Sequence, residues 1–526
     1  MHDKKFGIGQ PVRRKEDLRL LTGKGRYTTD VELAEQLRAV VLRSPHAHAN
    51  IKSIDAAAAL AMPGVVAVLT GADVTADNLK PTPTDNATFG PRQAQMAFPD
   101  VVLWNRDGSD MHPSPLLPLA VGKVRYVGEG VALIVAETLA IAKDAADLVE
   151  VDYDTLPAAT HPEDAAKPDA PQLWAEPTNV CLDAEIGDAP ATEAVFAKAA
   201  HTVRFKTWIQ RVTGVTMEPR SATAFYDTSN DHIILHVAAG SGSVRMRAGV
   251  IAMIGIAPER LRVICNDVGG NFGTRNALYP ETALITWASM RLKRSIKWVS
   301  ERTESFAADF QGRDLAADIE LAIDVKGKFL AMRGSYLGNV GAYNLSIVPL
   351  RKAVGILTSV YDVPTAYVTA RSVRSNTPTT VPYRSAGRPE AMFIMERLID
   401  LACKTAGLHM PAALESNSVA MLVQFLTVNH GISFLPRLSV WDKLKSGELI
   451  AVPVRDRLMN SATIDAITHA SRQLPVAAEE FLRFLQGEFQ DVHELANASP
   501  KREAAAAGSA RSLRAAGHAS TGDKRS

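Results

Sequence analysis

The segment 261–292 constrains the fold of this chain most strongly. Apolar and polar residues alternate from 261 to 265, which predicts a strand with one buried face that ends near Val268. Two glycines follow, and Pro280 then opens a run of apolar residues at helical spacing. A strand, a glycine-rich turn and a helix in this order indicate a protein of mixed α and β structure.

The turn inside this segment, GGNFGTR, has the composition of a loop that binds a ligand through its main chain. Gly269 and Gly270 permit positive φ and let a ligand approach the backbone closely. Consecutive amides in such a turn can bind an anion, and Arg275 could complete the charge. Pro280 and Glu281 place a helix N-terminus nearby. The loop matches neither nucleotide fingerprint, and a tight turn without a ligand is the alternative.

Strand and helix patterns continue on both sides of this segment. Before it we expect strands and helices over 37–55, 56–64, 65–71, 123–137, 138–150 and 151–158. The stretch 159–180 is rich in Pro and Ala, which is typical of a linker. After residue 180, strands are expected over 232–239, 261–268, 294–300 and 367–373, with helices over 244–256 and 280–292. The fold class is therefore α+β.

Composition excludes several classes of function. The formal net charge of +1 predicts no nucleic-acid or anionic-membrane partner, and the absence of any run of eighteen uncharged apolar residues predicts no membrane span. The three cysteines lie far apart, too few for the four thiolates of an iron–sulfur cluster. This cysteine usage, and a start without an apolar signal core, favour a cytoplasmic location.

Two further groups of residues could carry chemistry. His46 and His48 share one face of a predicted strand, but two ligands make a poor metal site, so no metal site is expected. Glu218 and Arg220, in TMEPRS, could act as an acid and a base. An ion pair inside the core is the more economical interpretation.

Seven ordered blocks carry a family resemblance that spans roughly residues 5–408. They are GRYTTDV, LRSPHAHANIKSIDAAAALAMPGVVAVLTGADV, GKVRYVGEGVALIVAET, AADLVEVDYDTLPA, TMEPRSATAFYD, DVGGNFGTRNALYPE and YRSAGRPEAMFIMERLID. Together they closely resemble the molybdenum-cofactor-binding large subunit of the xanthine dehydrogenase / aldehyde oxidase / carbon monoxide dehydrogenase family. The resemblance implies an α/β hammerhead domain over 12–160, a linker over 161–184 and a first molybdopterin-binding domain over 185–408, without the second such domain.

The same resemblance implies a cofactor and its site. The cofactor would be molybdopterin, possibly as its cytosine dinucleotide, with its metal held by the pterin dithiolene and not by side chains. By matching the family's motifs, the cofactor-binding residues are expected to be Gly269, Gly270, Asn271, Phe272, Gly273, Arg275 and Arg384. The amide of Phe272 would lie close to the metal. In the second loop, YRSAGRPE, Ser385 and Ala386 fall where substrate is contacted.

Departures from the family pattern bear on the substrate. The loop 383–390 has no cysteine, unlike that of a dedicated carbon monoxide oxidiser. Asn276 stands where purine oxidisers carry a glutamate, and Ala386 stands where they carry an aromatic residue. The stretch AAGSGS lacks the family's usual glutamine. An aldehyde or an N-heterocycle, hydroxylated with oxygen from water, is the implied substrate class.

The C-terminal part resembles something else. Residues 415–486 look like the end of the effector-binding domain of LysR-type regulators, a partial periplasmic-binding-like lobe, and the tail 497–526 has the composition of a disordered segment. No glutamate in 410–526 occupies the context of the family's catalytic base, so no catalytic residue is assigned.

These features lead to three alternatives for the whole chain. The first is a large subunit, impaired as it stands, that works with a FAD-binding medium subunit and a [2Fe-2S] small subunit. The second is an inactive gene fusion, and the third is a small-molecule-binding module in the LysR-like end.

Overall fold

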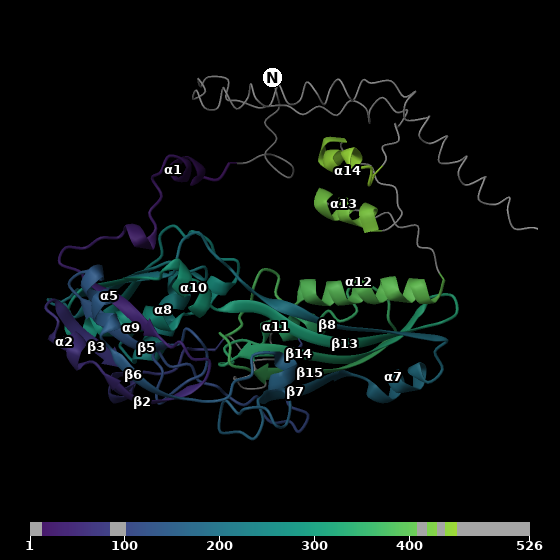
Figure 1. The fold of residues 1–526 in the computed structure, drawn as a ribbon, viewed down its shortest axis with the longest axis horizontal. Coiled ribbons are helices and arrows are strands. Elements are labelled where there is room, and N and C mark those ends of the chain that lie inside the picture. The colour runs from purple at the N-terminus through teal and green to yellow at the C-terminus, as the bar shows by residue number, and fades with distance from the viewer. Residues whose placement is uncertain (1–12, 85–100, 408–417, 429–436, 450–526) are drawn as a thin grey trace, which may run out of the picture. The chain divides into compact units, whose positions relative to one another are not determined.

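The computed structural model describes residues 13–84, 101–407, 418–428 and 437–449 (Figure 1). The chain divides into two compact units, residues 1–410 and 411–526. Within the described part of the first unit, the strands form a seven-stranded, a five-stranded and a three-stranded sheet. The two larger sheets each enclose a separate apolar core.

The seven-stranded sheet interleaves strands from two distant regions of the chain, in the order β11-β10-β9-β12-β1-β5-β3. Its strands are β1 (Leu37–Arg43), β3 (Val65–Thr70), β5 (Gly130–Ala136), β9 (Ser221–Asp227), β10 (His232–Val237), β11 (Leu261–Ile264) and β12 (Ile296–Val299). The two regions meet where β1 runs parallel to β12, with Leu37 opposite Ile296. The expected hammerhead and cofactor domains therefore share one sheet, and their limits at 12–160 and 185–408 stay predictions.

Helices cover this sheet and shape the loops at its edge. They are α2 (Ala57–Ala61), α3 (Gly71–Ala76), α5 (Leu139–Asp147), α8 (Gly242–Ile254), α9 (Pro280–Leu292) and α10 (Arg302–Ala308). Helix α9 packs on β9 and β12, and α8 packs on β11. Pro280 is the first residue of α9, as the sequence predicted, because a proline needs no amide partner in the first turn.

The second large sheet of the unit is five-stranded, in the order β7-β15-β14-β13-β8. Its strands are β7 (Val180–Gly187), β8 (His201–Thr213), β13 (Gln311–Ile323), β14 (Phe329–Gly341) and β15 (Thr365–Arg374). Its helices are α6 (Pro162–Ala165), α7 (Ala189–Phe196), α11 (Val348–Val354) and α12 (Arg388–Thr405). Helix α12 lies along β8 and β13 (Figure 1). Its residues Ile394, Leu398 and Ala402 are buried in the core of this sheet.

The three-stranded sheet combines parts of two predicted strands that turned out to be broken with the expected strand 151–158. It contains β2 (Ala49–Asp55), β4 (Lys123–Val124) and β6 (Glu150–Thr155). The expected strand 37–55 divides into β1 and β2 because Pro45 has no amide hydrogen for the ladder and Ser44 Oγ accepts the amide of His46 at 3.0 Å. The expected strand 123–137 likewise divides into β4 and β5, at a turn where Gly128 takes a φ of 100°.

The segment expected as a linker is folded. Ala159 and Ala165 are buried against Leu337 and Val373 of the five-stranded sheet. Asn179 is also buried, and its side-chain oxygen accepts the amide of Leu173 at 3.1 Å. Short apolar side chains and one satisfied amide therefore hold 159–180 against the sheet, although its composition is that of a loop.

Short helical elements occur in both units. They are α1 (Asp17–Leu21) in the first unit, and α13 (Val419–Val428), η5 (Arg437–Val440) and α14 (Trp441–Lys445) in the second. Residues 450–486 of the LysR-like segment and the tail 497–526 lie outside the described residues. Among the described helices, none is long and apolar enough to cross a membrane.

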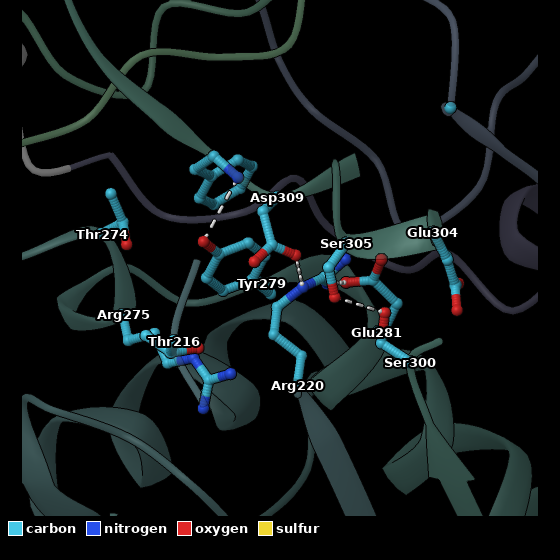
Figure 2. A network of polar contacts seen from close by, with 12 residues as sticks. Thr216, Arg220, Thr274, Arg275, Tyr279, Glu281, Ser300, Glu304, Ser305 and Asp309 are labelled. Carbon is cyan, nitrogen blue, oxygen red and sulfur yellow. Dashed lines mark hydrogen bonds and ion pairs between the residues drawn. The ribbon is translucent and has the colours of Figure 1, made fainter. Parts of the chain in front are cut away.

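A buried cluster of charges ties β1 to the segment that precedes β9 (Figure 2). Arg220 donates from Nε to Asp309 at 2.6 Å and from Nη1 to Glu281 at 2.5 Å. Arg43 donates from Nη2 to the other oxygen of Glu281 at 2.6 Å and from Nε to Glu304 at 2.7 Å. The ion pair expected between Glu218 and Arg220 is wrong in its partners, since Arg220 binds these carboxylates instead.

The cluster keeps Glu281 ionised although it is buried. Burial by itself would raise the pKa of this carboxyl, but the charges of Arg220 and Arg43 outweigh burial and hold the pKa at about 2. Because this pKa lies below that of an unfolded glutamate, the resulting stability is present above pH of about 4.3 and is lost as the pH falls through the folded pKa.

A second buried carboxyl, Glu129, lies in the turn between β4 and β5. It accepts hydrogen bonds from the hydroxyl of Tyr343 and from the amide of Arg125, the latter at 2.6 Å. Burial raises the pKa of Glu129 to about 7, and the two hydrogen bonds oppose the rise only in part. Glu129 therefore accepts a proton near neutral pH.

Substituting Glu281→Gln tests the cluster. The variant leaves two buried guanidinium groups without their shared charge, so we expect the free energy of unfolding to fall by about 3–5 kcal/mol in chemical denaturation. Glu301→Gln removes a carboxylate from an exposed pair with Lys143 and is the matched control. Equal losses in the two variants would contradict a structural role for the buried cluster.

Substituting Glu129→Gln tests the second carboxyl. A raised folded pKa gives stability that is full below the unfolded pKa of about 4.3 and declines as the pH rises towards 7. We therefore expect the melting temperature of wild type to decline over this pH range and that of Glu129→Gln to lack this decline. Glu150→Gln, which changes an exposed residue of β6, should show the same decline as wild type. Parallel profiles for wild type and Glu129→Gln would show that this carboxyl does not titrate in that range.

Candidate functional site

The glycine loop between β11 and α9 has glycines where the backbone takes a positive φ and approaches its neighbours closely. Gly270 has a φ of 123° and Gly273 a φ of 96°, and between them Phe272 has a φ of 49°. A Cβ atom on Gly270 would lie 3.0 Å from the side chain of Thr216, and one on Gly273 would lie 2.5 Å from the carbonyl of Pro382. The loop is therefore pressed against two neighbouring segments, and its glycines permit that approach.

The amides of this loop differ in whether they have partners. The amide of Gly269 donates to Glu218 Oε2 at 2.6 Å, and that of Gly273 donates to the side-chain oxygen of Asn271 at 3.2 Å. The amides of Gly270, Asn271 and Phe272 make no hydrogen bond to any residue that the structure describes. The loop thus carries three successive main-chain donors without an internal acceptor, which is the feature of an anion- or ligand-binding turn.

Glu218 holds the loop from beneath. Its amide donates to Gly269 O at 3.1 Å, and its carboxylate accepts the amides of Gly269 and, at 3.3 Å, of Thr28. Burial raises the pKa of Glu218, against the effect of these amides and of Arg275. Sequence reasoning had no signal for this role, because it depends on contacts between segments about fifty residues apart.

Arg275 is turned into the protein rather than towards the open side of the loop. Its side chain is buried, and Nη2 donates to the carbonyl of Glu218. Burial lowers the pKa of this guanidinium. The sequence predicted that Arg275 could complete the charge of the loop, and the structure places it behind the backbone, where it can act on the loop only from within.

The second predicted loop lies against the first. Arg384 donates its amide to the carbonyl of Phe272 at 2.8 Å, although the two residues are far apart in sequence. Ser385 is exposed with a φ of 66°, whereas Ala386 is buried. Of the expected cofactor and substrate residues, the structure therefore brings Phe272, Arg384 and Ser385 together at one place.

Arg313, which sequence reasoning missed, supports this junction. Its guanidinium donates to Arg384 O at 2.9 Å and to Glu390 Oε2 at 2.8 Å, and it lies 5.2 Å from the ring centre of Tyr383. Arg313 and Asp314 both have positive φ inside β13. Arg313 still pairs with Arg211 of β8, whereas the pairing skips Asp314. Backbone strain of this kind, in a strand next to a loop, cannot be predicted from a sequence pattern.

Apolar side chains surround the open amides. Phe272 is 43% exposed, Val215 is 45% exposed and Met217 is 87% exposed, and the latter two flank the Thr216 that touches Gly270. Asn271 packs on Gly240, where any Cβ atom would collide with it, and Gly240 donates to Arg275 O at 3.1 Å. The AAGSGS stretch therefore contacts the glycine loop, whose main-chain donors lie near the exposed side chains of Val215, Met217 and Phe272, here called the apolar rim. A flat heteroaromatic ligand fits such a surface.

The histidines considered as metal ligands have structural contacts. The ring of His46 meets that of Tyr153 at 4.8 Å, and His48 Nδ1 lies 2.8 Å from the carbonyl of Pro157. Within the described residues, no group of three or more His, Cys, Asp or Glu side chains is arranged to hold a metal ion.

Comparison with protein families matches three regions of the chain. Residues 173–416 match the molybdopterin cofactor-binding domain. Residues 22–103 and 93–157 match the α/β hammerhead domain of aldehyde oxidase and xanthine dehydrogenase. Residues 384–490 match the LysR substrate-binding domain. The α+β fold class and the order of these regions predicted from the sequence are confirmed.

Individual relatives agree with this assignment. The chain is 33% identical over 406 residues to the 6-hydroxypseudooxynicotine dehydrogenase complex subunit gamma of Paenarthrobacter nicotinovorans, covering 76% of this chain and 48% of that one. It is 32% identical over 411 residues to the carbon monoxide dehydrogenase large chain of Hydrogenophaga pseudoflava, covering 74% and 47%. The chain thus spans about half the length of the curated relatives it matches.

Solved structures support the same conclusion. Quinoline 2-oxidoreductase from Pseudomonas putida 86 superposes with a TM-score of 0.68 at 33% identity, over 77% of this chain and 49% of that one. Together with the ordered motifs and the two paired loops, these matches settle the family. Over residues 22–416, the chain belongs to the family of molybdopterin-cofactor-binding large chains that includes aldehyde oxidase, xanthine dehydrogenase and carbon monoxide dehydrogenase.

Proposed function

We propose that the glycine loop binds a molybdenum–molybdopterin cofactor and that the chain serves as part of the large subunit of a molybdenum hydroxylase. The observation that carries the proposal is the run of three amides at Gly270, Asn271 and Phe272 without a partner among the described residues. They lie beside a second loop that is bonded to Phe272 through Arg384. The cytosine dinucleotide form of the cofactor is part of the same proposal.

The described residues fit such a cofactor. Main-chain donors suit the ring heteroatoms and oxygens of the group, and the apolar rim of Val215, Met217 and Phe272 suits its flat ring system. The dithiolene would supply the metal's sulfur ligands, so the site requires no cluster of protein ligands. When bound, the cofactor would supply two-electron redox chemistry for hydroxylating an electrophilic carbon with oxygen from water.

The chain's own residues would bind and orient the cofactor and would keep water out of the site. The amides of Gly270, Asn271 and Phe272 would donate to the cofactor, while Glu218 holds the loop at Gly269 so that these donors keep their direction. Gly273 and Arg275 would keep the loop seated on its neighbours. The exposed ring of Phe272 would keep water away from the reacting atoms.

The proposed substrates are aldehydes or N-heterocycles. Ser385, exposed at the loop junction, would contact the substrate, and the small buried Ala386 would leave room for it. Asn276 carries no charge and its side-chain oxygen accepts from Asn271 at 3.0 Å, so it is not disposed as a base for a purine. Quinoline, after which the similar quinoline 2-oxidoreductase is named, is itself an N-heterocycle.

Electron transfer and proton abstraction would need further protein. The three cysteines of this chain cannot ligate an iron–sulfur cluster, so we propose a [2Fe-2S] small subunit and a FAD-binding medium subunit as partners. The carboxylate of Glu218 is occupied by the amides of Gly269 and Thr28. We therefore expect the chain by itself to bind cofactor without turning over substrate, because no base is in place among the described residues.

The LysR-like segment offers a second candidate, the binding of a small molecule. Its support is the family match over 384–490. Melting-temperature shifts with small organic ligands, in protein that carries no molybdenum, would favour this function over the first.

Cofactor retention tests the proposal. We expect Gly270→Ala to reduce bound molybdenum several-fold, because a Cβ atom at this φ strains the loop and crowds Thr216. The measurement is molybdenum per chain by mass spectrometry, with pterin fluorescence as a second readout, on chain produced together with the proposed partner subunits.

The control for this experiment is Gly122→Ala. Gly122 also has a positive φ, of 66°, but open space around it and no place in the loop. Molybdenum in the control at the wild-type level, with loss in Gly270→Ala, supports the proposal. Wild-type chain without molybdenum or pterin under these conditions would contradict it.

A further inference from the structure

A small cavity lies beneath the glycine loop, inside the seven-stranded sheet. It has a volume of about 20 Å³, room for one water-sized guest. Its walls come from β9, β10, β12, α8, α9 and the loop itself. The polar side chains in the wall that matter most are Arg220, Ser221 and Arg275.

These three side chains have hydrogen-bonding groups without partners. Arg220 Nη2, Arg275 Nε, Arg275 Nη1 and Ser221 Oγ are buried and form no hydrogen bond with the part of the chain that the structure describes. Arg220 and Ser221 are each only 4% exposed, and Arg275 is only 3% exposed. Leaving such groups unsatisfied in the interior is costly, so the cavity calls for a guest that meets them.

The hydrogen-bonding groups of the cavity wall determine which guest can bind there. A guanidinium group only donates, and a serine hydroxyl can rotate to donate as well. Of the other wall residues, Tyr279 and Thr282 carry hydroxyl groups, and the remainder are mainly apolar, namely Val237, Ala238, Ala239, Met246, Ala277 and Trp298. A water molecule accepts two hydrogen bonds and also needs acceptors for its own two protons. A monatomic anion accepts from all the donors at once and needs no acceptor.

We propose that this cavity is a binding site for a monatomic anion, which would be chloride in the cell. The anion would bind the buried side chains of Arg220, Ser221 and Arg275, whereas the proposed cofactor would bind the main-chain amides of the glycine loop. It does not depend on the molybdenum assignment.

The charges around the cavity are consistent with an anion. Arg220 is compensated by Asp309 and Glu281, and Glu281 is shared with Arg43. Arg275 has a weaker partner, since its Nη1 lies 3.7 Å from Glu218 Oε2 without a hydrogen bond.

Two pKa directions agree with this distribution. Burial lowers the pKa of Arg275 and raises that of Glu218, against the attraction between their opposite charges. Burial also raises the pKa of Tyr279, so this wall residue adds no negative charge of its own. An anion beside Arg275 would supply the missing compensation.

Such an anion would also stabilise the loop. Arg275 donates from Nη2 to the carbonyl of Glu218, and Glu218 in turn holds Gly269. An anion bound to the remaining nitrogens of Arg275 would fix this guanidinium and, through it, the backbone that carries the open amides.

Thermal unfolding of the full chain tests the proposal. We expect the melting temperature to rise by a few degrees, and to saturate, when sodium gluconate is replaced by sodium chloride or bromide at constant ionic strength. Ser221→Ala removes one donor with little change in volume and should shift the half-saturating halide concentration upward several-fold. Ser229→Ala, on an exposed turn, should behave as wild type.

Diffraction from bromide-soaked crystals locates the site. We expect an anomalous peak within hydrogen-bonding distance of Arg275 Nη1 and Arg220 Nη2 in wild type, weakened in Ser221→Ala and absent in Arg275→Met if that variant folds. Equal melting temperatures in gluconate and halide, or density for water without an anomalous peak, would overturn the proposal. A halide effect that is the same in Ser221→Ala and wild type, with no peak in the cavity, would overturn it as well.

Discussion

One carboxylate, that of Glu281, fixes the framework on which the loops depend. It stands in the first turn of α9 and accepts from Arg43 of β1 on one oxygen and from Arg220 on the other. Strands from two distant regions of the chain are joined in one sheet, and this ion cluster lies across that junction. Because both guanidinium groups are buried, loss of the shared charge affects the sheet and the start of α9 together.

The conformation of the glycine loop depends on this framework. It begins where β11 ends and finishes where α9 begins, so both of its ends are fixed. Glu218 and Arg275 hold it from the inner side, and the amide of Arg384 meets it from the second loop. Its remaining amides then point to no acceptor within the described chain. The same loop thus has an inner face towards a polar cavity and an outer face suited to a cofactor.

Sequence reasoning predicted the parts of this site that are local. The alternation before Val268, the glycine pair and Pro280 predicted a strand, a turn and a helix, and all three are present, although β11 ends at Ile264, earlier than expected. The order of the family's domains was also predicted correctly from ordered motifs. These features depend on residues close together in the chain, for which spacing and residue type are sufficient.

What the sequence could not predict are contacts between distant segments. The partners of Arg220 lie far along the chain, so TMEPRS alone indicated the wrong ion pair with Glu218. The inward direction of Arg275 and the bond between Arg384 and Phe272 depend in the same way on packing. The prediction of a linker over 159–180 from its composition was also wrong. Alanine is common in linkers, but here Ala159 and Ala165 pack against the five-stranded sheet.

Amide hydrogen exchange, read residue by residue in the chain with and without bound cofactor, tests most directly whether the open amides bind the cofactor. We expect Gly270, Asn271 and Phe272 to exchange rapidly in the cofactor-free chain and to become protected when the cofactor is bound. Gly269, already bonded to Glu218, should be protected in both states. Protection of all four amides before cofactor is added, or no change at the three when it is bound, would contradict a cofactor-binding role for this loop.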